Sequence, residues 1–163
     1  MALGKLQFEG SSALRTQAEV VTEFDRELED LVCMMHETMQ LYDGVGLAAP
    51  QIGISKQVVT FSFEPFVMIN PEIMETGGTQ ILREGCLSFP NLFFDIERPK
   101  KVLVAWEDTN GVSHIQEFEG LEATAIQHEI DHLNGKLFID HVSGMKVLME
   151  KKKLAAKRKG PKR

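Results

Sequence analysis

The stretch QHEIDHLNG, residues 127–135, places two histidines four positions apart with a glutamate directly after the first. On an α-helix, His128 and His132 project from one face a single turn apart, so their imidazoles can converge on one ion. Glu129 points about 100° away around the helix axis. Its carboxylate can therefore reach a water molecule held by the ion, and take its proton, without being a ligand. The alternative is a helix whose two histidines are satisfied by neighbouring carboxylates.

The helix that carries this stretch is predicted over LEATAIQHEIDHLN, residues 121–134. Gly120 precedes it, and Gly135 stands where a left-handed residue commonly ends a helix. The two glycines therefore bound the element that presents His128 and Glu129.

An amphipathic helix is predicted over TEFDRELEDLVCMMHETMQLY, residues 22–42, with Thr22 as a candidate cap. Its apolar face comprises Leu28, Val32, Met35 and Met39. Cys33 and His36 lie beside that face, so we expect both to be packing residues rather than ligands.

Short β-rich runs separate the two helices: KQVVTFSF at 56–63, FVMINPEI at 66–73 and KVLVAWED at 101–108. Asn110-Gly111 is a strong signal for a hairpin between the last run and VSHIQEF, residues 112–118. We therefore predict one α+β domain over residues 1–163, with antiparallel sheets packed around a central metal-binding helix, an N-terminal amphipathic helix and a basic C-terminal helix.

A catalytic metal site usually has a third protein ligand and one open position. His114 and His141 are candidates, but Cys86 in EGCLSFP is the best, because Gly85 allows close backbone approach and a thiolate is deprotonated beside a cation. The alternatives for Cys86 are an inert buried thiol and an independent nucleophile. A Cys–His–His set with water in the fourth position suits Zn²⁺, Fe²⁺, Co²⁺ or Ni²⁺.

Charge is distributed unevenly along the chain. Residues 151–163, KKKLAAKRKGPKR, hold 8 of the 18 basic residues and no acid, so residues 1–150 carry 10 basic and 24 acidic residues. Such a tail can contact a polyanion, and RNA rather than DNA is the candidate we favour. The alternative is a solvated C-terminal helix that aids solubility.

The sequence favours a cytoplasmic protein that does not enter a membrane. It contains no run of eighteen apolar residues, and the first residues lack a basic segment followed by an apolar one. In that compartment Cys33 and Cys86 are expected to stay reduced.

Three stretches taken together, GVGLAAPQIG at 44–53, EGCLSFP at 84–90 and QHEIDHLNG at 127–135, closely resemble the signature motifs of peptide deformylases in order and spacing. The resemblance covers residues 20–145. It implies a hydrolase that removes the formyl group from N-formylmethionine at the start of newly made proteins and releases formate. It also implies Fe²⁺ as the physiological ion, with Zn²⁺, Ni²⁺ or Co²⁺ able to substitute.

The resemblance assigns roles to individual residues. Cys86, His128 and His132 bind the metal, and Glu129 is the general acid and base. Gln51 and the backbone N–H of Leu87 stabilise the oxyanion, while the main chain of Gly46 holds the substrate peptide.

The resemblance also reaches residues around the site. Glu84 and Arg98 match an acidic and a basic residue that pair across the site in the family; alone they would be read as a surface ion pair. The basic tail, residues 151–163, matches a helix that docks bacterial relatives on ribosomal RNA. Phe93 and Phe94 are equally consistent with the core and with the rim of a peptide groove.

Two competing functions remain open from the sequence. One is a broader metallopeptidase that cleaves peptide bonds. The other is a ribosome-binding module without enzymatic activity, in which the metal is structural and a fourth protein ligand closes the site.

Overall fold

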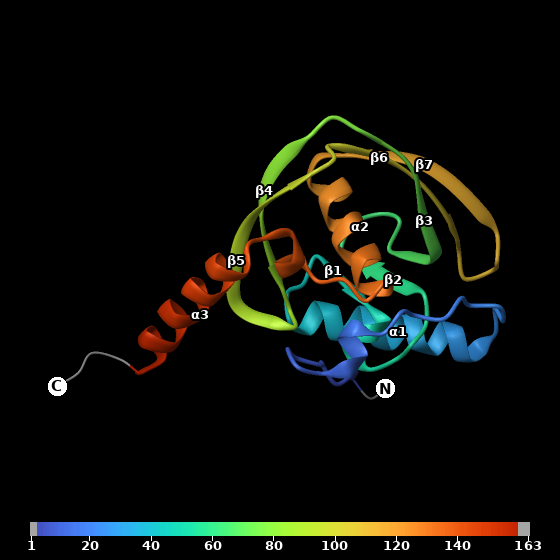
Figure 1. The fold of residues 1–163 in the computed structure, drawn as a ribbon. Helices are drawn as coiled ribbons and strands as arrows, with labels where there is room; N and C mark the ends of the chain where they lie inside the picture. The colour runs from blue at the N-terminus through green and yellow to red at the C-terminus, as the bar shows by residue number, and fades with distance from the viewer. Residues whose placement is uncertain (1–2, 160–163) are drawn as a thin grey trace.

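The computed structural model describes residues 3–159. Figure 1 shows the arrangement of its helices and strands. In chain order they are η1 (Ser12–Arg15), α1 (Arg26–Leu41), β1 (Gly46–Ala48), η2 (Ala49–Ile52), β2 (Val58–Phe61), β3 (Val67–Gly77), β4 (Gln80–Cys86), β5 (Phe89–Arg98), β6 (Lys101–Glu107), β7 (Ser113–Glu119), α2 (Gly120–Leu133), η3 (Phe138–His141) and α3 (Gly144–Lys159). This confirms the predicted α+β class.

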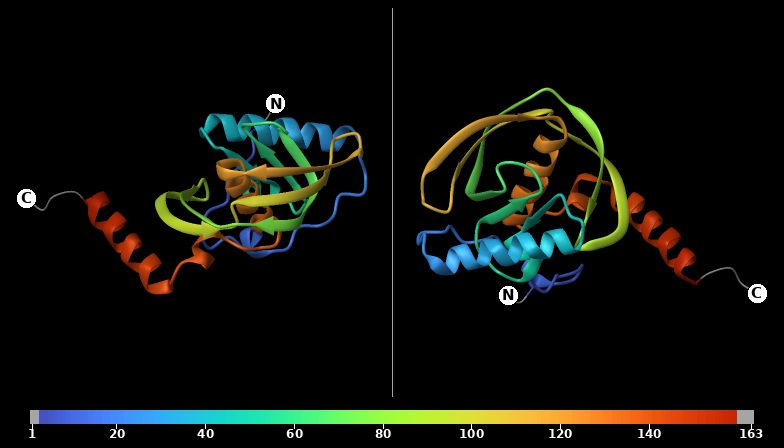
Figure 2. Two further views of the ribbon diagram at one scale, coloured as in Figure 1. Left: turned by 90° about the horizontal axis from the view of Figure 1, so that it is seen from above. Right: turned by 180° about the vertical axis from the view of Figure 1, so that it is seen from behind.

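The strands form two separate antiparallel sheets. One has the order β1-β2-β3-β6-β7, and the other is the two-stranded ribbon β4-β5. Figures 1 and 2 show α2 in the space between the two sheets, with α1 along one end of the larger sheet. The helix that carries the two histidines is therefore the central element of the fold, as predicted.

Helix α2 is buried on nearly every side. Its apolar residues pack against strands β2, β3, β6 and β7; they are Ala123, Ile126, Ile130 and Leu133. Its remaining face is polar and also buried; it comprises Thr124, Gln127, His128, Glu129 and His132. Polar side chains are seldom buried without hydrogen-bond partners or a function, so this second face marks the site.

Helix α1 begins four residues later than the sequence suggested. Its cap is Asp25, whose side chain accepts a hydrogen bond from the Leu28 amide, so the prediction of Thr22 was wrong. The segment upstream is held outside the helix, because the Val21 amide donates to Asn70 Oδ1 at 2.8 Å. Cys33 is exposed rather than packed, and it forms no disulfide with Cys86.

The ribbon β4-β5 was not predicted from the sequence, although it supplies one wall of the site. Alternate residues of β5 face inward and are buried, namely Leu92, Phe94 and Ile96. Phe93, between two of them, is 47% exposed. The sequence left open whether Phe93 and Phe94 lie in the core or at the rim of a groove; in the structure Phe94 belongs to the core and Phe93 to the surface.

Helix α3 projects away from the body of the molecule (Figure 1). Val147, in its first turn, is buried with Leu92 and Phe138 and ties the helix to the ribbon β4-β5. The basic stretch 151–159 continues this helix, and the remaining part of the predicted tail, residues 160–163, lies outside the described range. No helix within the described range is long and apolar enough to cross a membrane.

Candidate active site

Three potential metal ligands from two elements lie together. Cys86 is the last residue of β4, and His128 and His132 lie one turn apart on α2. Their ligand atoms are all within 4.8 Å of one another, and Cys86 Sγ is 3.4 Å from His132 Nε2. Ligand bonds of about 2.0–2.3 Å at tetrahedral angles place two donor atoms about 3.5 Å apart. The donor set and its spacing therefore fit a tetrahedral metal site.

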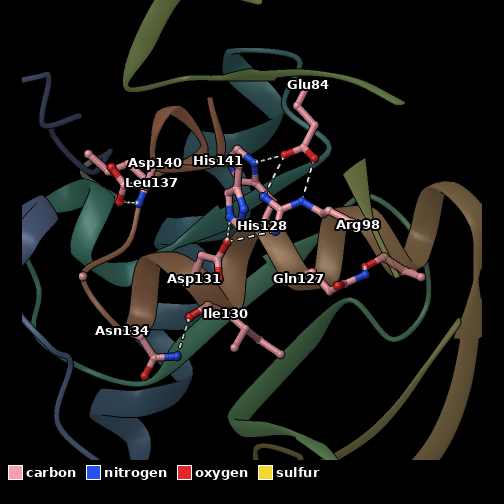
Figure 3. Close-up of polar contacts among 12 residues, drawn as sticks. Glu84, Arg98, Gln127, His128, Ile130, Asp131, Asn134, Leu137, Asp140 and His141 are labelled. Carbon is pink, nitrogen blue, oxygen red and sulfur yellow. Dashed lines mark hydrogen bonds and ion pairs between the residues drawn. The ribbon is translucent and has the colours of Figure 1, made fainter. Parts of the chain in front are cut away.

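The ring of His128 is oriented by a buried ion pair. Glu84 Oε1 lies 2.9 Å from His128 Nδ1, so Nε2 is the ring nitrogen that remains for a metal (Figure 3). Arg98 donates to both oxygens of the same carboxylate, through Nε at 2.6 Å and Nη2 at 3.0 Å. Burial raises the pKa of Glu84, but the hydrogen bonds from His128 and Arg98 outweigh burial and lower it below its ordinary value. Glu84 therefore stays ionised and is the kind of acceptor that a metal-binding histidine would need.

The ion pair extends outward to the protein surface. Arg98 Nη1 donates to Asp131 Oδ2 at 2.9 Å, and His141 Nε2 lies 3.0 Å from the same oxygen (Figure 3). His141, one of the weaker ligand candidates, thus lies at the outer end of this network. The other, His114, lies on the exposed β6-β7 hairpin beside Asp108, away from the site.

The two histidines differ in their electrostatic surroundings. Burial and the neighbouring His128 hold the pKa of His132 well below its ordinary value, so its ring is neutral, which is the form that binds a metal. Burial acts on His128 in the same direction, but hydrogen bonds to Cys86 and Glu84 outweigh it and raise the pKa of His128. A cation between the Cys86 sulfur and the two imidazole rings would replace the proton that His128 shares with Cys86.

Glu129 lies beside this group, in a position with few polar partners. Its side chain is 4% exposed, and Oε2 is buried without a hydrogen bond from any described residue. Burial raises the pKa of Glu129 to about 7. The side chain packs against Gly46, where a Cβ would lie 2.9 Å from Glu129 Cγ and from Oε1. Glycine at this position is therefore what allows the carboxylate to reach the site.

Gln51 is held by the short helix η2. Its Oε1 accepts from the Ala48 amide at 2.9 Å, which fixes the orientation of the amide group. Nε2 then points at Cys86 Sγ, 3.5 Å away, and at Ser88 Oγ, 3.3 Å away. Gln51 is 1% exposed, so it is not a solvated loop residue. Ser88 was not singled out from the sequence, since nothing in its spacing links it to Gln51.

A cavity of about 700 Å³ opens over these groups. The residues predicted to bind the metal, to catalyse or to bind substrate that line it are Gly46, Gln51, Cys86, Leu87, His128 and Glu129. Leu87 follows Cys86 directly in the chain and lines the same cavity. Arg83 and Phe93 of the ribbon β4-β5 form part of the same wall. The structure thus brings the predicted metal, catalytic and substrate-binding residues other than His132 to one cavity, and His132 Nε2 lies 3.4 Å from Cys86 Sγ.

The chain is similar in sequence to known deformylases along most of its length. The family model for polypeptide deformylase matches residues 5–147. The peptide deformylase of Thermotoga maritima is 48% identical over 148 residues, which is 89% of this chain and 90% of that protein. Peptide deformylase 1 of Bacillus anthracis is 44% identical over 88% of this chain and 94% of its own length.

Solved structures agree with the sequence comparison. The structure of the Legionella pneumophila peptide deformylase superposes with a TM-score of 0.90 at 39% identity, covering 97% of this chain and 96% of that one. A Synechococcus elongatus peptide deformylase in complex with actinonin gives a TM-score of 0.88 at 42% identity, with 92% and 85% covered. The chain therefore belongs to the polypeptide deformylase family.

Proposed function

We propose that Cys86, His128 and His132 hold a divalent cation with which the chain removes the N-formyl group of formylmethionyl peptides, and that Glu129 carries the proton in this reaction. Deformylation of nascent peptides is the activity of the family, and the chain is an enzyme. The observation that carries the residue assignment is the buried carboxylate of Glu129, whose Oε2 has no partner among the described residues and which lines the same cavity as Cys86 and His128 of the three-donor group.

A divalent cation held by these residues would lower the pKa of water toward neutrality and polarise the formyl carbonyl. We infer Fe²⁺ as the native ion, with Zn²⁺, Ni²⁺ or Co²⁺ as substitutes. The donor set supports this range, because a thiolate and two imidazoles suit several late first-row metals. An Fe²⁺-loaded enzyme of this kind should lose activity in air, through oxidation of the iron or of Cys86.

Glu129 is suited to both halves of the proton transfer. In the metal-free protein burial raises the pKa of Glu129 to about 7, and a divalent cation nearby would lower it, so the carboxylate would be ionised and able to accept a proton near neutral pH. Its carboxylate takes a proton from the attacking water and delivers it to the departing nitrogen of the methionine. Because Oε2 has no hydrogen-bond partner within residues 3–159, no other group of that range competes for the proton.

Gln51 and Leu87 are placed to stabilise negative charge on the former formyl oxygen. The Gln51 Nε2 group points toward Cys86, and the amide of Leu87 is next in the chain. Loss of one such donor typically costs about 2.7–4 kcal/mol of transition-state stabilisation. The hydrogen bond from Ala48 to Gln51 Oε1 keeps the amide from turning its oxygen toward this charge.

Gly46 starts strand β1, which in the described part of the chain pairs with β2 along one edge only. An extended peptide can add to the other edge through main-chain hydrogen bonds, and this is the role we propose for the Gly46 backbone. Such binding positions the N-terminus of the substrate without depending on its sequence.

The experiment that tests the assignment is formate release from a formyl-Met peptide after anaerobic loading with Fe²⁺. Glu129→Gln should retain the metal and lose hydrolysis. A variant that keeps full hydrolysis would refute the role of Glu129. Cleavage of an unformylated peptide would favour a metallopeptidase, and metal retention without hydrolysis by the wild type would favour a structural site.

We also propose a cytoplasmic location, one catalytic domain over residues 1–163, and contact between the basic tail and ribosomal RNA. Helix α3 supports the last point, since it projects from an acidic body and carries Lys151, Lys152 and Lys153 in sequence. Deleting residues 151–163 should leave hydrolysis of a short formyl-peptide intact and weaken co-sedimentation with ribosomes at low salt. Unchanged co-sedimentation would refute the contact.

A further inference from the structure

The outer face of the ribbon β4-β5 carries an aromatic side chain with a cation above it. Phe93 pairs with Gly85 in the ladder, and its ring lies over that glycine, where a Cβ would be 2.6 Å from the ring. Arg83, two residues before Gly85, places its guanidinium carbon 5.5 Å from the centre of the same ring. Both side chains are exposed and line the active-site cavity.

Among the described residues that line the cavity, Arg83 is the one exposed side chain with a positive charge. The other ionisable groups of the wall are less available to a substrate: Glu84 and His128 are hydrogen-bonded to each other, and Glu129 is buried. Asp43, on the loop before β1, is an exposed acidic residue that lines the same cavity.

Arg83 also lacks a carboxylate partner within residues 3–159. Asp95 is its opposite residue in the β4-β5 ladder and is exposed on the same face, but no carboxylate oxygen of the described residues lies within 4.0 Å of the guanidinium. The guanidinium instead stacks on Phe93, which orders it without using its hydrogen-bond donors. An ordered cation with free donors is a receptor for a carboxylate.

The position of Arg83 along the cavity indicates which part of a substrate it would meet. It precedes the ligand Cys86 by three residues in a strand, which corresponds to about 10 Å. An extended peptide with its formyl group at the metal covers that distance in two to three residues. The side chains that follow formylmethionine are therefore the ones that come within reach.

We propose that Arg83, supported by Phe93, is a specificity-determining residue that favours formylmethionyl peptides with aspartate or glutamate at the second or third position. This inference rests on the proposed function and adds a substrate preference to it. Because the ion pair would form near solvent, the expected preference is modest, about two- to fivefold in kcat/KM for aspartate over asparagine. It should shrink as salt is added.

The test uses tripeptides with a C-terminal amide, so that no terminal carboxylate competes for the arginine. Formyl-Met peptides carrying aspartate, asparagine or lysine at the second or the third position are compared by kcat/KM for formate release. The wild type should prefer aspartate over asparagine at one of the two positions. Arg83→Gln should bring that ratio to one, Arg83→Glu should invert it in favour of lysine, and Arg83→Lys should retain part of it.

Arg26→Gln is the matched control, because Arg26 is exposed on α1 and pairs with Asp30 away from the cavity. It should leave the ratio unchanged. Phe93→Leu should reduce the ratio by releasing the guanidinium. Equal rates for aspartate and asparagine peptides in the wild type at both positions, or an aspartate preference that survives Arg83→Gln, would overturn the inference while leaving deformylation standing. Absence of formate from every peptide would overturn the proposed function and this inference with it.

Discussion

The substitution Glu129→Gln should change how the stability of the metal-free protein depends on pH. Glu129 is buried, and burial raises its pKa from the ordinary value of 4.5 to about 7. Between these two values the folded state keeps a proton on the carboxyl group that the unfolded state has released. The free energy of unfolding therefore falls as the pH rises through this window. Glutamine keeps the shape of the side chain and cannot titrate, so the variant lacks this loss.

The size of the effect follows from the shift in pKa. Each unit is worth about 1.4 kcal/mol, so a rise of about 2.5 units destabilises the ionised folded protein by about 3 kcal/mol once the pH is well above 7. Part of this loss already occurs below pH 5. Between pH 5 and pH 8, the wild type should lose about 2.5 kcal/mol more than Glu129→Gln.

The assay is urea unfolding of both proteins, stripped of metal and kept reduced, at intervals from pH 5 to pH 8. All other titrating groups, His128 and His132 included, are common to the two proteins, so the difference between the two pH profiles isolates Glu129 to a first approximation. Parallel profiles would refute the buried, high-pKa carboxylate. A wild type that gains stability relative to the variant as the pH rises would refute the sign of the argument.

Three further changes have defined outcomes. Gly46→Ala should destabilise the fold by about 1–3 kcal/mol and lower kcat, because the added Cβ would lie 2.9 Å from Glu129. The control is Gly77→Ala, whose Cβ has no atom within 4 Å and which should change neither stability nor kcat. Unfolding midpoints and formate release check both variants. Glu84→Gln should weaken metal affinity about 10- to 100-fold in a chelator competition, since His128 loses its charged acceptor; unchanged affinity would contradict this role. Chelation of the wild type should abolish formate release, and anaerobic Fe²⁺ should restore it; activity that persists in verified metal-free protein would exclude the metal site from the reaction.

The elements that local periodicity determines were predictable from the sequence. Helix α2 and the common face of His128 and His132 follow from 3.6 residues per turn and from the flanking glycines. The β6-β7 hairpin follows from Asn110-Gly111. In these cases the residues that decide the structure are neighbours in the chain.

The ribbon β4-β5 and the cap of α1 depend on contacts that spacing does not reveal. The stretch EGCLSFP joins glycine, serine and proline, so its β-structure comes from pairing and burial rather than from the propensity of its residues. Asp25 and Thr22 are both good caps, and the choice between them is made where Val21 contacts Asn70.

The hydrogen-bond network around the candidate ligands also depends on contacts that the sequence does not reveal. Glu84 and Arg98 are identifiable as a pair by resemblance, but their burial is not visible from the chain, and burial is what changes a weak surface pair into the support of His128. Asp131 and His141 join this network only after α2 and η3 are packed. Ser88 reaches Gln51 across 37 residues.

The separation of the two sheets gives the metal a mechanical role as well. Cys86 belongs to the small ribbon, while both histidines belong to the helix that packs against the large sheet. An ion bound by all three residues would therefore cross-link the ribbon to the helix and the large sheet. Withdrawing it should let the ribbon open before the rest of the protein does, and its amide hydrogens should be the first to exchange with heavy water. The same opening would expose Phe89 and Leu92, so loss of the ion would also make the protein prone to aggregation.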